Sequence, residues 1–304
     1  MTLEQLVAAE LAEPVNPQVR AMAEAIVARY GKAARAVLFY GSCLREARLD
    51  GLMLDFYLIV STYREAYGQG WLSFANRRLP PNVFPFEHGG LVAKYAVLSE
   101  ADFARLSSSE TRNVSVWARF AQPSRLIWAA DSAAAARAAG AVAQAAPALL
   151  AAARPMLPEA LTIDALWQDA FRLTYGAELR AERKERAGSV LSADPERYRR
   201  FTAPALAAAG LDATVDGDCV RFSATADRRR GEADWRRRRR EGKMLTLARL
   251  AKASTTYAGG IDYLAWKINR HAGTAIEIKP WQRRWPILGA ISLLPRLLRK
   301  GAIG

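Results

Sequence analysis

A glycine-serine turn and one carboxylate farther along the chain are the residues best suited to do chemistry. Gly41 and Ser42 end an apolar stretch, and Asp55 follows Ser42 after twelve intervening residues, inside a second apolar stretch. Glycine lets the backbone approach a phosphate, and a serine hydroxyl beside the amides of a helix N-terminus favours an anion. A nearby carboxylate can hold Mg²⁺ together with substrate phosphates. The pattern predicts a nucleotidyl-transfer site, with a plain strand-turn-helix and a buried cap as the alternative.

The second apolar stretch lacks an acid that such sites commonly carry. Two carboxylates one position apart share a strand face and can hold two metal ions, or one metal ion bidentately. Tyr57 stands in the place of the second carboxylate. Another element could bring Asp50, Glu87 or Asp102 to Asp55 instead. We select Glu87 as the second metal ligand because it ends an apolar stretch directly before a predicted hairpin turn.

That hairpin is predicted around residues 88–90, whose sequence is His-Gly-Gly. The apolar stretch 83–86 enters the turn and the stretch 91–98 returns from it, with Lys94 inside the returning strand. A lysine between apolar strand residues is commonly the solvent face of an edge strand. The functional alternative is that Lys94 contacts a triphosphate at the strand end.

The strands are followed by segments with helical patterns. Residues 132–155 are rich in alanine, start after the possible N-cap Asp131 and break near Arg154-Pro155, where we place a domain boundary. Further helices are predicted over residues 163–186 and 261–271, and a small hairpin or wing is predicted over 213–222 around an Asp-Gly turn.

The predicted fold class is therefore α+β. It comprises a nucleotidyltransferase domain with a small mixed sheet over residues 1–153, a helical winged-helix-like domain over 154–278 and an amphipathic membrane-associating tail over 279–304.

Composition sets independent limits on the class of protein. A chain of 304 residues with 51% hydrophobic content can bury a core of ordinary size and favours two domains over one. No run approaches the roughly 20 apolar residues of a membrane-spanning helix, and the N-terminal residues do not resemble a secretory signal. We expect a cytoplasmic protein. Two cysteines and two histidines give no structural zinc site at any usual spacing, and disulfides are not expected.

Positive charge is concentrated in the second half of the chain. Lysine and arginine total 44 against 30 acids, and arginines recur over 228–230 and 236–240. Such a run can bind nucleic acid or an anionic membrane, or form a solvated helix face whose charges partly pair. The tail 279–304 carries two tryptophans and an apolar stretch between basic clusters, which suits insertion among lipid headgroups. The tail favours an anionic membrane surface, with packing on its own domain as the alternative.

Four segments resemble the mitochondrial-type CDP-diacylglycerol synthases, the translocator assembly and maintenance family. In chain order they are Phe39-Tyr40-Gly41-Ser42, Leu54-Asp55-Phe56, the strand 92–99 with Lys94-Tyr95, and the segment 118–123 with Arg119. In that family the Asp-Phe strand has no second acid, so Tyr57 agrees with its pattern. The likeness covers roughly the first 130 residues motif by motif and is looser beyond them, where the family continues with a winged-helix-like domain and a basic amphipathic segment.

The resemblance implies a CTP:phosphatidate cytidylyltransferase of phospholipid biosynthesis. Such an enzyme transfers a cytidylyl group from CTP to phosphatidic acid with Mg²⁺, giving CDP-diacylglycerol and pyrophosphate, and would be peripheral on the inner face of the cytoplasmic membrane. Gly41 and Ser42 would bind CTP phosphates, Asp55 the metal, and Lys94 and Arg119 the triphosphate or the lipid phosphate. Glu87 rests on the hairpin argument alone.

Three alternatives stay open. The acceptor is another phosphorylated lipid or a small phosphate, the chain is a nucleic-acid-binding nucleotidyltransferase-like protein, or it is a catalytically silent membrane-interaction protein. Nucleic acid is the less favoured partner because it leaves the tryptophans of the tail unexplained.

Overall fold

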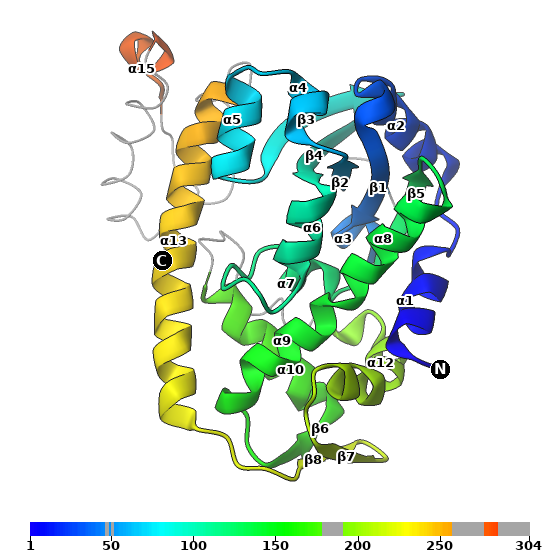
Figure 1. Ribbon diagram of the computed structural model, residues 1–304, viewed down its shortest axis with the longest axis vertical. Coiled ribbons are helices and arrows are strands. Elements are labelled where there is room, and N and C mark those ends of the chain that lie inside the picture. Colours follow the sequence, from blue (N-terminus) through cyan, green and yellow to red (C-terminus); the bar gives the residue numbers. More distant parts are fainter. Residues whose placement is uncertain (46–48, 50–51, 178–190, 257–276, 285–304) are drawn as a thin grey trace.

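The chain folds around two β-sheets of different size. The structure, a computed structural model, describes residues 1–45, 49, 52–177, 191–256 and 277–284. Within them a five-stranded mixed sheet is flanked by helices, and a three-stranded sheet lies at the opposite end of the molecule (Figure 1). The predicted α+β class is confirmed.

The large sheet has the strand order β3-β4-β2-β1-β5. Its strands are β1 (Ala34–Tyr40), β2 (Met53–Val60), β3 (Asn82–His88), β4 (Leu91–Ser99) and β5 (Ser124–Ala129). β2 and β4 run parallel, whereas the other neighbouring pairs are antiparallel. The predicted hairpin is confirmed as β3 and β4, joined through Gly89 and Gly90 at φ values of 57° and 77° that glycine adopts without strain.

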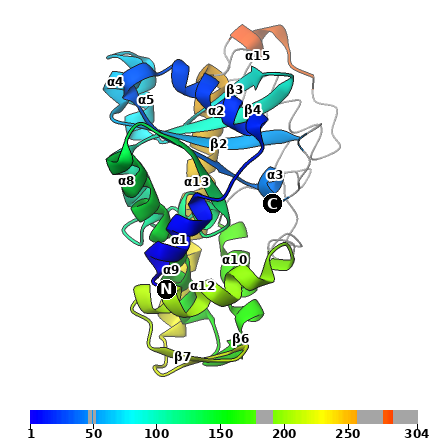
Figure 2. The ribbon, with the colours of Figure 1, turned by 90° about the vertical axis from the view of Figure 1, so that its right-hand side faces the viewer.

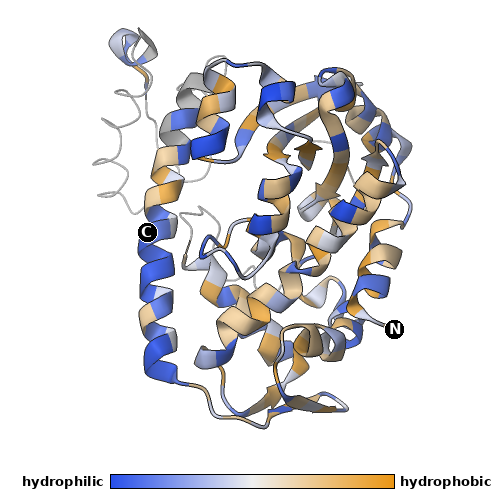
Figure 3. Ribbon diagram, viewed as in Figure 1, coloured by the Kyte–Doolittle hydropathy of each residue, from blue (hydrophilic) through white to orange (hydrophobic). Residues whose placement is uncertain are grey.

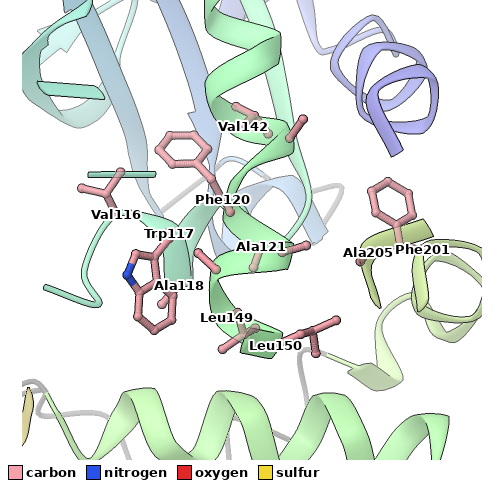
Figure 4. Packing of buried hydrophobic residues seen from close by; sticks show 14 of the residues in the cluster. Val116, Trp117, Ala118, Phe120, Ala121, Val142, Leu149, Leu150, Phe201 and Ala205 are labelled. Atoms are coloured by element: carbon pink, nitrogen blue, oxygen red, sulfur yellow. The ribbon is translucent and has the colours of Figure 1, made fainter. Parts of the chain in front are cut away.

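Both faces of the large sheet are buried, because residues alternate between two apolar clusters along each strand. Leu38, Tyr57 and Ile59 belong to the larger cluster, whereas Val37 and Phe56 belong to the smaller one. The helices that contribute to the larger cluster include α1 (Leu3–Leu11), α6 (Glu100–Ser107), α7 (Trp117–Phe120), α8 (Ser132–Ala143) and α9 (Ala145–Ala153). Figure 4 shows side chains of α7, α8 and α9 together with Phe201 and Ala205, which belong to the same core.

Other elements cover the smaller cluster and the ends of the strands. These are α2 (Pro17–Ala28), η1 (Gly31–Ala33), α3 (Ser42–Arg45), α4 (Tyr63–Tyr67) and α5 (Trp71–Arg78). α2 begins with a proline after the N-cap Asn16, whose side chain accepts from Gln18 N at 2.8 Å.

The second half of the chain is mainly helical with a small sheet. Its elements are η2 (Arg154–Met156), β6 (Ala160–Thr162), α10 (Ile163–Tyr175), α12 (Pro195–Ala208), β7 (Ala213–Asp216) and β8 (Cys219–Phe222). The hairpin predicted over 213–222 is confirmed as β7 and β8, with Gly217 at φ 53°, and β6 adds a third strand in the order β6-β8-β7. The predicted helix over 163–186 is present as α10, and 178–190 lie outside the described residues.

The predicted break near Arg154-Pro155 coincides with η2, where α9 ends. The apolar core nevertheless continues across it, since the larger cluster contains Leu149 as well as Trp167 and Trp235. The division into two domains therefore stays a prediction, although the chain changes character at the expected place.

The long helix α13 (Arg228–Thr256) connects the two halves, and α15 (Pro280–Arg284) lies beyond it (Figure 2). Trp235 is 1% exposed and donates from its indole nitrogen to Ala152 O at 2.9 Å. Lys252, near the other end of α13, donates to Pro81 O at 2.8 Å. The predicted helix over 261–271 and residues 285–304 of the predicted tail lie outside the described residues.

One apolar helical stretch stands out in the part of the chain that the structure describes. Ser132–Met156 is long and apolar enough to cross a membrane, contrary to the sequence expectation that no run approaches this length, because its many alanines count as apolar. Of its most apolar 18 residues 61% are buried inside the protein, and buried core helices have the same length and composition.

Candidate active site

The turn after β1 requires glycine for two reasons. Gly41 has a φ of 97°, in the left-handed region that side chains disfavour. A Cβ atom at this position would also lie 3.1 Å from Asp55 Oδ2. The backbone of the turn thus comes into direct contact with the carboxylate of the next strand, and Ser42 begins the single turn of α3 immediately after it.

Asp55 lies between two strands that carry the other candidate residues. Its Cα partners are Tyr40 on β1 and Lys94 on β4. Lys94 Nζ lies 3.0 Å from Asp55 Oδ1, with side chains 33% and 19% exposed. The sheet therefore brings Gly41, Asp55 and Lys94 together.

The carboxylate of Asp55 keeps unused capacity to bind a cation. Its Oδ1 atom is buried, and the ammonium of Lys94 lies at ion-pair distance but outside hydrogen-bond geometry, so no described residue donates a hydrogen bond to it. A buried carboxylate oxygen without a hydrogen bond fits Mg²⁺, which often takes only one or two protein carboxylates and otherwise binds substrate phosphates and water. No group of three or more His, Cys, Asp or Glu residues that could hold a metal occurs among the described residues.

Tyr57 shows why the second acid is missing. It lies two residues beyond Asp55 on the same sheet face, is 3% exposed, and packs its ring against Tyr40, Phe103 and Phe120 at centroid distances of 5.3, 6.5 and 5.2 Å. A carboxylate there would be buried among aromatic rings without a partner, at a cost of several kcal/mol. The packing of this face thus leaves Asp55 as the one acid of the strand that can serve a metal.

Lys94 does not lie on an edge strand. β4 sits between β3 and β2, so the edge-strand interpretation of this lysine is wrong. Its flanking residues Ala93 and Tyr95 are buried, and its partly exposed side chain brings the ammonium to Asp55. Burying the stem of a lysine inside a sheet is uncommon without an anionic partner.

The other acids considered as second ligands lie elsewhere. Glu87 is exposed on β3 opposite Val92, whereas Lys94 pairs with Pro85. It is therefore two strands and two residues from Asp55, about 12 Å between Cα atoms from ideal sheet spacings. Asp102 accepts from Tyr63 Oη at 2.6 Å beyond the other end of β4. Asp50 lies outside the described residues.

Arg119 lies on α7, which covers the Asp55 face of the sheet. Its neighbour Phe120 packs against Tyr40 with ring centroids 5.9 Å apart (Figure 4 shows Phe120 in its surroundings). The guanidinium is half-buried and donates to Ser115 O. The structure thus places α7 beside the strand that leads to Gly41, with the guanidinium of Arg119 bound to the carbonyl of Ser115 just before the helix.

A pair of basic residues on α13 supports this region and was not singled out from the sequence. Arg249 donates to Pro80 O at 2.9 Å and to Ser115 Oγ at 3.1 Å, and Lys252 binds the carbonyls of Leu79 and Pro81. Burial and, to a smaller extent, the nearby Arg249 lower the pKa of Lys252 to about 7. The signal in the sequence is two basic residues three positions apart in an otherwise apolar helical stretch.

Comparisons with known proteins add no family assignment. A scan against protein-family models gave no match, and a search of curated proteins found no similar sequence.

Proposed function

We propose that this protein is a nucleotidyltransferase, a CTP:phosphatidate cytidylyltransferase that makes CDP-diacylglycerol and pyrophosphate. The observation that carries the proposal is the contact between the Gly41 turn and Asp55: a Cβ atom built on residue 41 would lie 3.1 Å from Asp55 Oδ2. Lys94 Nζ lies 3.0 Å from the other oxygen of the same carboxylate, Oδ1. A phosphate-binding turn, a metal-binding carboxylate and a cation on three adjacent elements are the groups that a nucleotidyl transfer needs.

Each group has a defined role in this proposal. The amides around Gly41 and the Ser42 hydroxyl hold phosphate oxygens of the triphosphate. Asp55 holds Mg²⁺, which supplies charge neutralisation and orientation when bound. Lys94 has a flexible stem, so its ammonium can exchange the carboxylate for a phosphate oxygen once the nucleotide is present.

The transfer itself requires little acid-base help from the protein. An oxygen of the acceptor phosphate, already ionised at neutral pH, attacks the α-phosphorus of CTP while the bond to the bridging oxygen of pyrophosphate breaks, and pyrophosphate leaves. No proton has to be removed from the acceptor. Arg119 would help to align the acceptor or the triphosphate, since a guanidinium can bind two phosphate oxygens at once.

The assignment of CTP as donor and phosphatidic acid as acceptor rests on the sequence resemblance. The Asp-Phe strand without a second acid, the Lys94-Tyr95 strand and the Arg119 segment support cytidylyl transfer to phosphatidic acid. The buried position of Tyr57 supports a one-acid site of this type. The same arguments support a nucleotidyltransferase-type fold followed by a winged-helix-like part built from α10, α12 and the β7–β8 hairpin.

A pyrophosphate-release screen tests the proposal. The purified full chain is incubated with CTP, ATP, GTP or UTP and Mg²⁺, with and without phosphatidic-acid vesicles, and the lipid product is identified by mass spectrometry. We expect release with CTP only when phosphatidic acid is present, and none after chelation of the metal. Asp55→Asn, purified in parallel, controls for contaminating enzymes.

Three outcomes would change the assignment. Release with CTP and a soluble phosphate acceptor, but not with phosphatidic acid, would keep the nucleotidyl transfer and replace the lipid. Release with another nucleotide would replace the base. No release under any condition would support the catalytically silent alternative.

A further inference from the structure

The helix α13 presents a row of cations on the side away from the protein. Arg229, Arg236, Arg240 and Lys243 are all exposed. At 100° per residue these four positions fall within an arc of about 60°, and they extend over about 21 Å of helix. We call this row the outer stripe. Figure 3 shows this part of α13 as a hydrophilic column along the edge of the molecule.

The opposite side of α13 is fixed to the protein. A Cβ at Gly231 would lie 2.5 Å from Pro155 Cβ, and one at Gly242 would lie 2.0 Å from Ala177 O. Trp235 is buried between them. These three positions lie about 200° to 240° around the helix from Arg229, so the outer stripe is directed away from the body and cannot rotate inward.

The outer stripe is not neutralised by neighbouring acids. Glu232 pairs with Arg228 at 3.3 Å, and Glu241 pairs with Arg237 at 2.7 Å, which agrees with the predicted helix whose charges partly pair. None of the four stripe residues makes an ion pair within the described part of the chain. Four unpaired cations in a row on a rigid helix are the electrostatic footprint of a polyanionic partner.

Large exposed apolar side chains on α13 and on the helix beside its C-terminal part point to a lipid surface as that partner. Met244, next to Lys243, is 65% exposed. α5 lies beside the C-terminal part of α13, because the carbonyl of Leu79, directly after α5, accepts a hydrogen bond from Lys252. On α5, Trp71 and Phe74 are 56% and 53% exposed. Arg78 lies 5.5 Å from the Phe74 ring centroid. Exposed aromatic residues beside arginine suit the headgroup region of a bilayer.

We propose that the outer stripe of α13 docks the protein on an anionic phospholipid surface, with its axis parallel to the bilayer. The preference for lipid over another polyanion rests in part on the proposed function, because an enzyme that acts on phosphatidic acid must reach its membrane. The stripe is distinct from the tail 279–304, and it contributes through charge rather than insertion.

Flotation with vesicles tests the docking. The full chain is mixed with phosphatidylcholine vesicles with or without phosphatidylglycerol, at low and high salt. The stripe variant carries Arg229→Gln, Arg236→Gln, Arg240→Gln and Lys243→Gln. The charge-matched control carries Arg228→Gln, Arg237→Gln, Arg105→Gln and Arg199→Gln, which removes cations already paired with acids. Glutamine has a helix propensity close to that of arginine, so both variants should fold.

We expect wild type and control to bind the anionic vesicles alike, and the stripe variant to bind them at least about 50-fold more weakly with a reduced salt dependence, since each cation near an anionic bilayer strengthens binding about fivefold. Equal binding by the stripe variant and wild type, or equal weakening in the control, would overturn the proposal. So would tighter wild-type binding to an RNA or DNA duplex than to vesicles at the same salt, lost only in the stripe variant.

Transfer to short-chain, water-soluble phosphatidate separates the two proposals. If the proposed function holds, the stripe variant keeps wild-type turnover on this soluble acceptor. If no variant transfers cytidylyl groups at all, the proposed function fails, and flotation alone still decides whether the stripe docks on lipid.

Discussion

Two carboxylate-cation pairs of this protein are built in opposite ways. Arg197 of α12 and Glu10 of α1 are 2% and 8% exposed, and their charges are fully engaged: Arg197 binds both oxygens of Glu10 and also Ala121 O at 3.1 Å. Ser124 N donates to the same carboxylate at 3.4 Å. Asp55 and Lys94 are partly exposed and share a single contact.

The difference indicates what each pair does. A buried pair with every group satisfied holds elements together and has no capacity left for a ligand. The Asp55–Lys94 pair is accessible, under-satisfied and in contact with a glycine turn, so a ligand can replace either partner. Changes at the first pair should therefore alter stability, and changes at the second should alter activity.

Breaking the buried pair should have the largest effect. Arg197→Met leaves the Glu10 carboxylate buried without its partner, and we expect a loss of about 3–5 kcal/mol in the free energy of unfolding. Urea denaturation followed by circular dichroism measures it. The double variant Glu10→Gln/Arg197→Met should recover part of the loss because no unpaired charge remains. A loss below about 1 kcal/mol in the single variant would contradict the structural role.

Asp55→Asn should leave unfolding nearly unchanged and lower cytidylyl transfer at least about 100-fold, or about 2.7 kcal/mol of transition-state stabilisation, because the amide cannot replace the carboxylate as a metal ligand. Steady-state pyrophosphate release is the measurement. Glu87→Gln serves as the comparison variant. A loss there as large as that of Asp55→Asn would show that Glu87 reaches the metal despite its position two strands away.

Gly41→Ala should affect both the stability of the fold and the binding of CTP. The left-handed backbone and the close Asp55 Oδ2 atom make a methyl group cost about 1–3 kcal/mol, and the turn must shift away from the carboxylate. We expect weaker CTP binding together with reduced stability. Gly90→Ala, at a positive φ of 77° and with open space around it, separates the backbone cost from the contact. Wild-type CTP binding in Gly41→Ala would remove the turn from the site.

Lys94→Met should reduce kcat/KM for CTP about tenfold, or about 1.4 kcal/mol, with less than about 1 kcal/mol of stability lost, because the pair is partly solvated. Lys94→Arg keeps the charge and should recover part of the activity. If Lys94→Met instead destabilises the fold as strongly as Arg197→Met, the two pairs are alike and the comparison fails.

The smallest expected effect is a pH dependence at Lys252. Its pKa in the folded protein is lowered to about 7, below the ordinary value of 10.5, so unfolding takes up a proton between these pH values and stability rises as pH increases. We expect a gain of about 1 kcal/mol between pH 7 and 8 that is absent in Lys252→Met. Parallel unfolding curves at the two pH values decide it, and an equal gain in the variant would assign the effect to other groups.

Much of the Asp55 site could be predicted because strand patterns and glycine turns are local signals. The hairpin of β3 and β4 and the wing at β7 and β8 follow from short apolar runs around glycine. The interior position of β4 could not be predicted, since the parallel pairing of β2 and β4 is a long-range contact. Lys94 was therefore open to interpretation as an edge residue.

The buried face of a helix was harder to predict where polar side chains are buried and apolar ones are exposed. On α5 the buried residues include Ser73 and Asn76, whereas Trp71 and Phe74 are exposed. The buried amide nitrogen of Asn76 is satisfied by donating to Val97 O at 2.9 Å. Hydrophobic periodicity alone would assign the opposite inner face to this helix. The roles of Arg249 and Lys252 were missed for a related reason. Their partners include backbone carbonyls near Pro80, and every residue type has a carbonyl, so the sequence does not indicate which ones bind.

The two close glycine contacts of α13 also restrict how this protein can change in length. Gly231 and Gly242 are eleven residues apart, which is about three helical turns, so both meet the body on one side. Inserting or deleting a single residue between them would rotate one contact by about 100° and bring a side chain against Pro155 or Ala177. Relatives of this chain should therefore tolerate insertions freely in the turn at Gly217, but vary the segment between these glycines only by whole turns, three or four residues at a time.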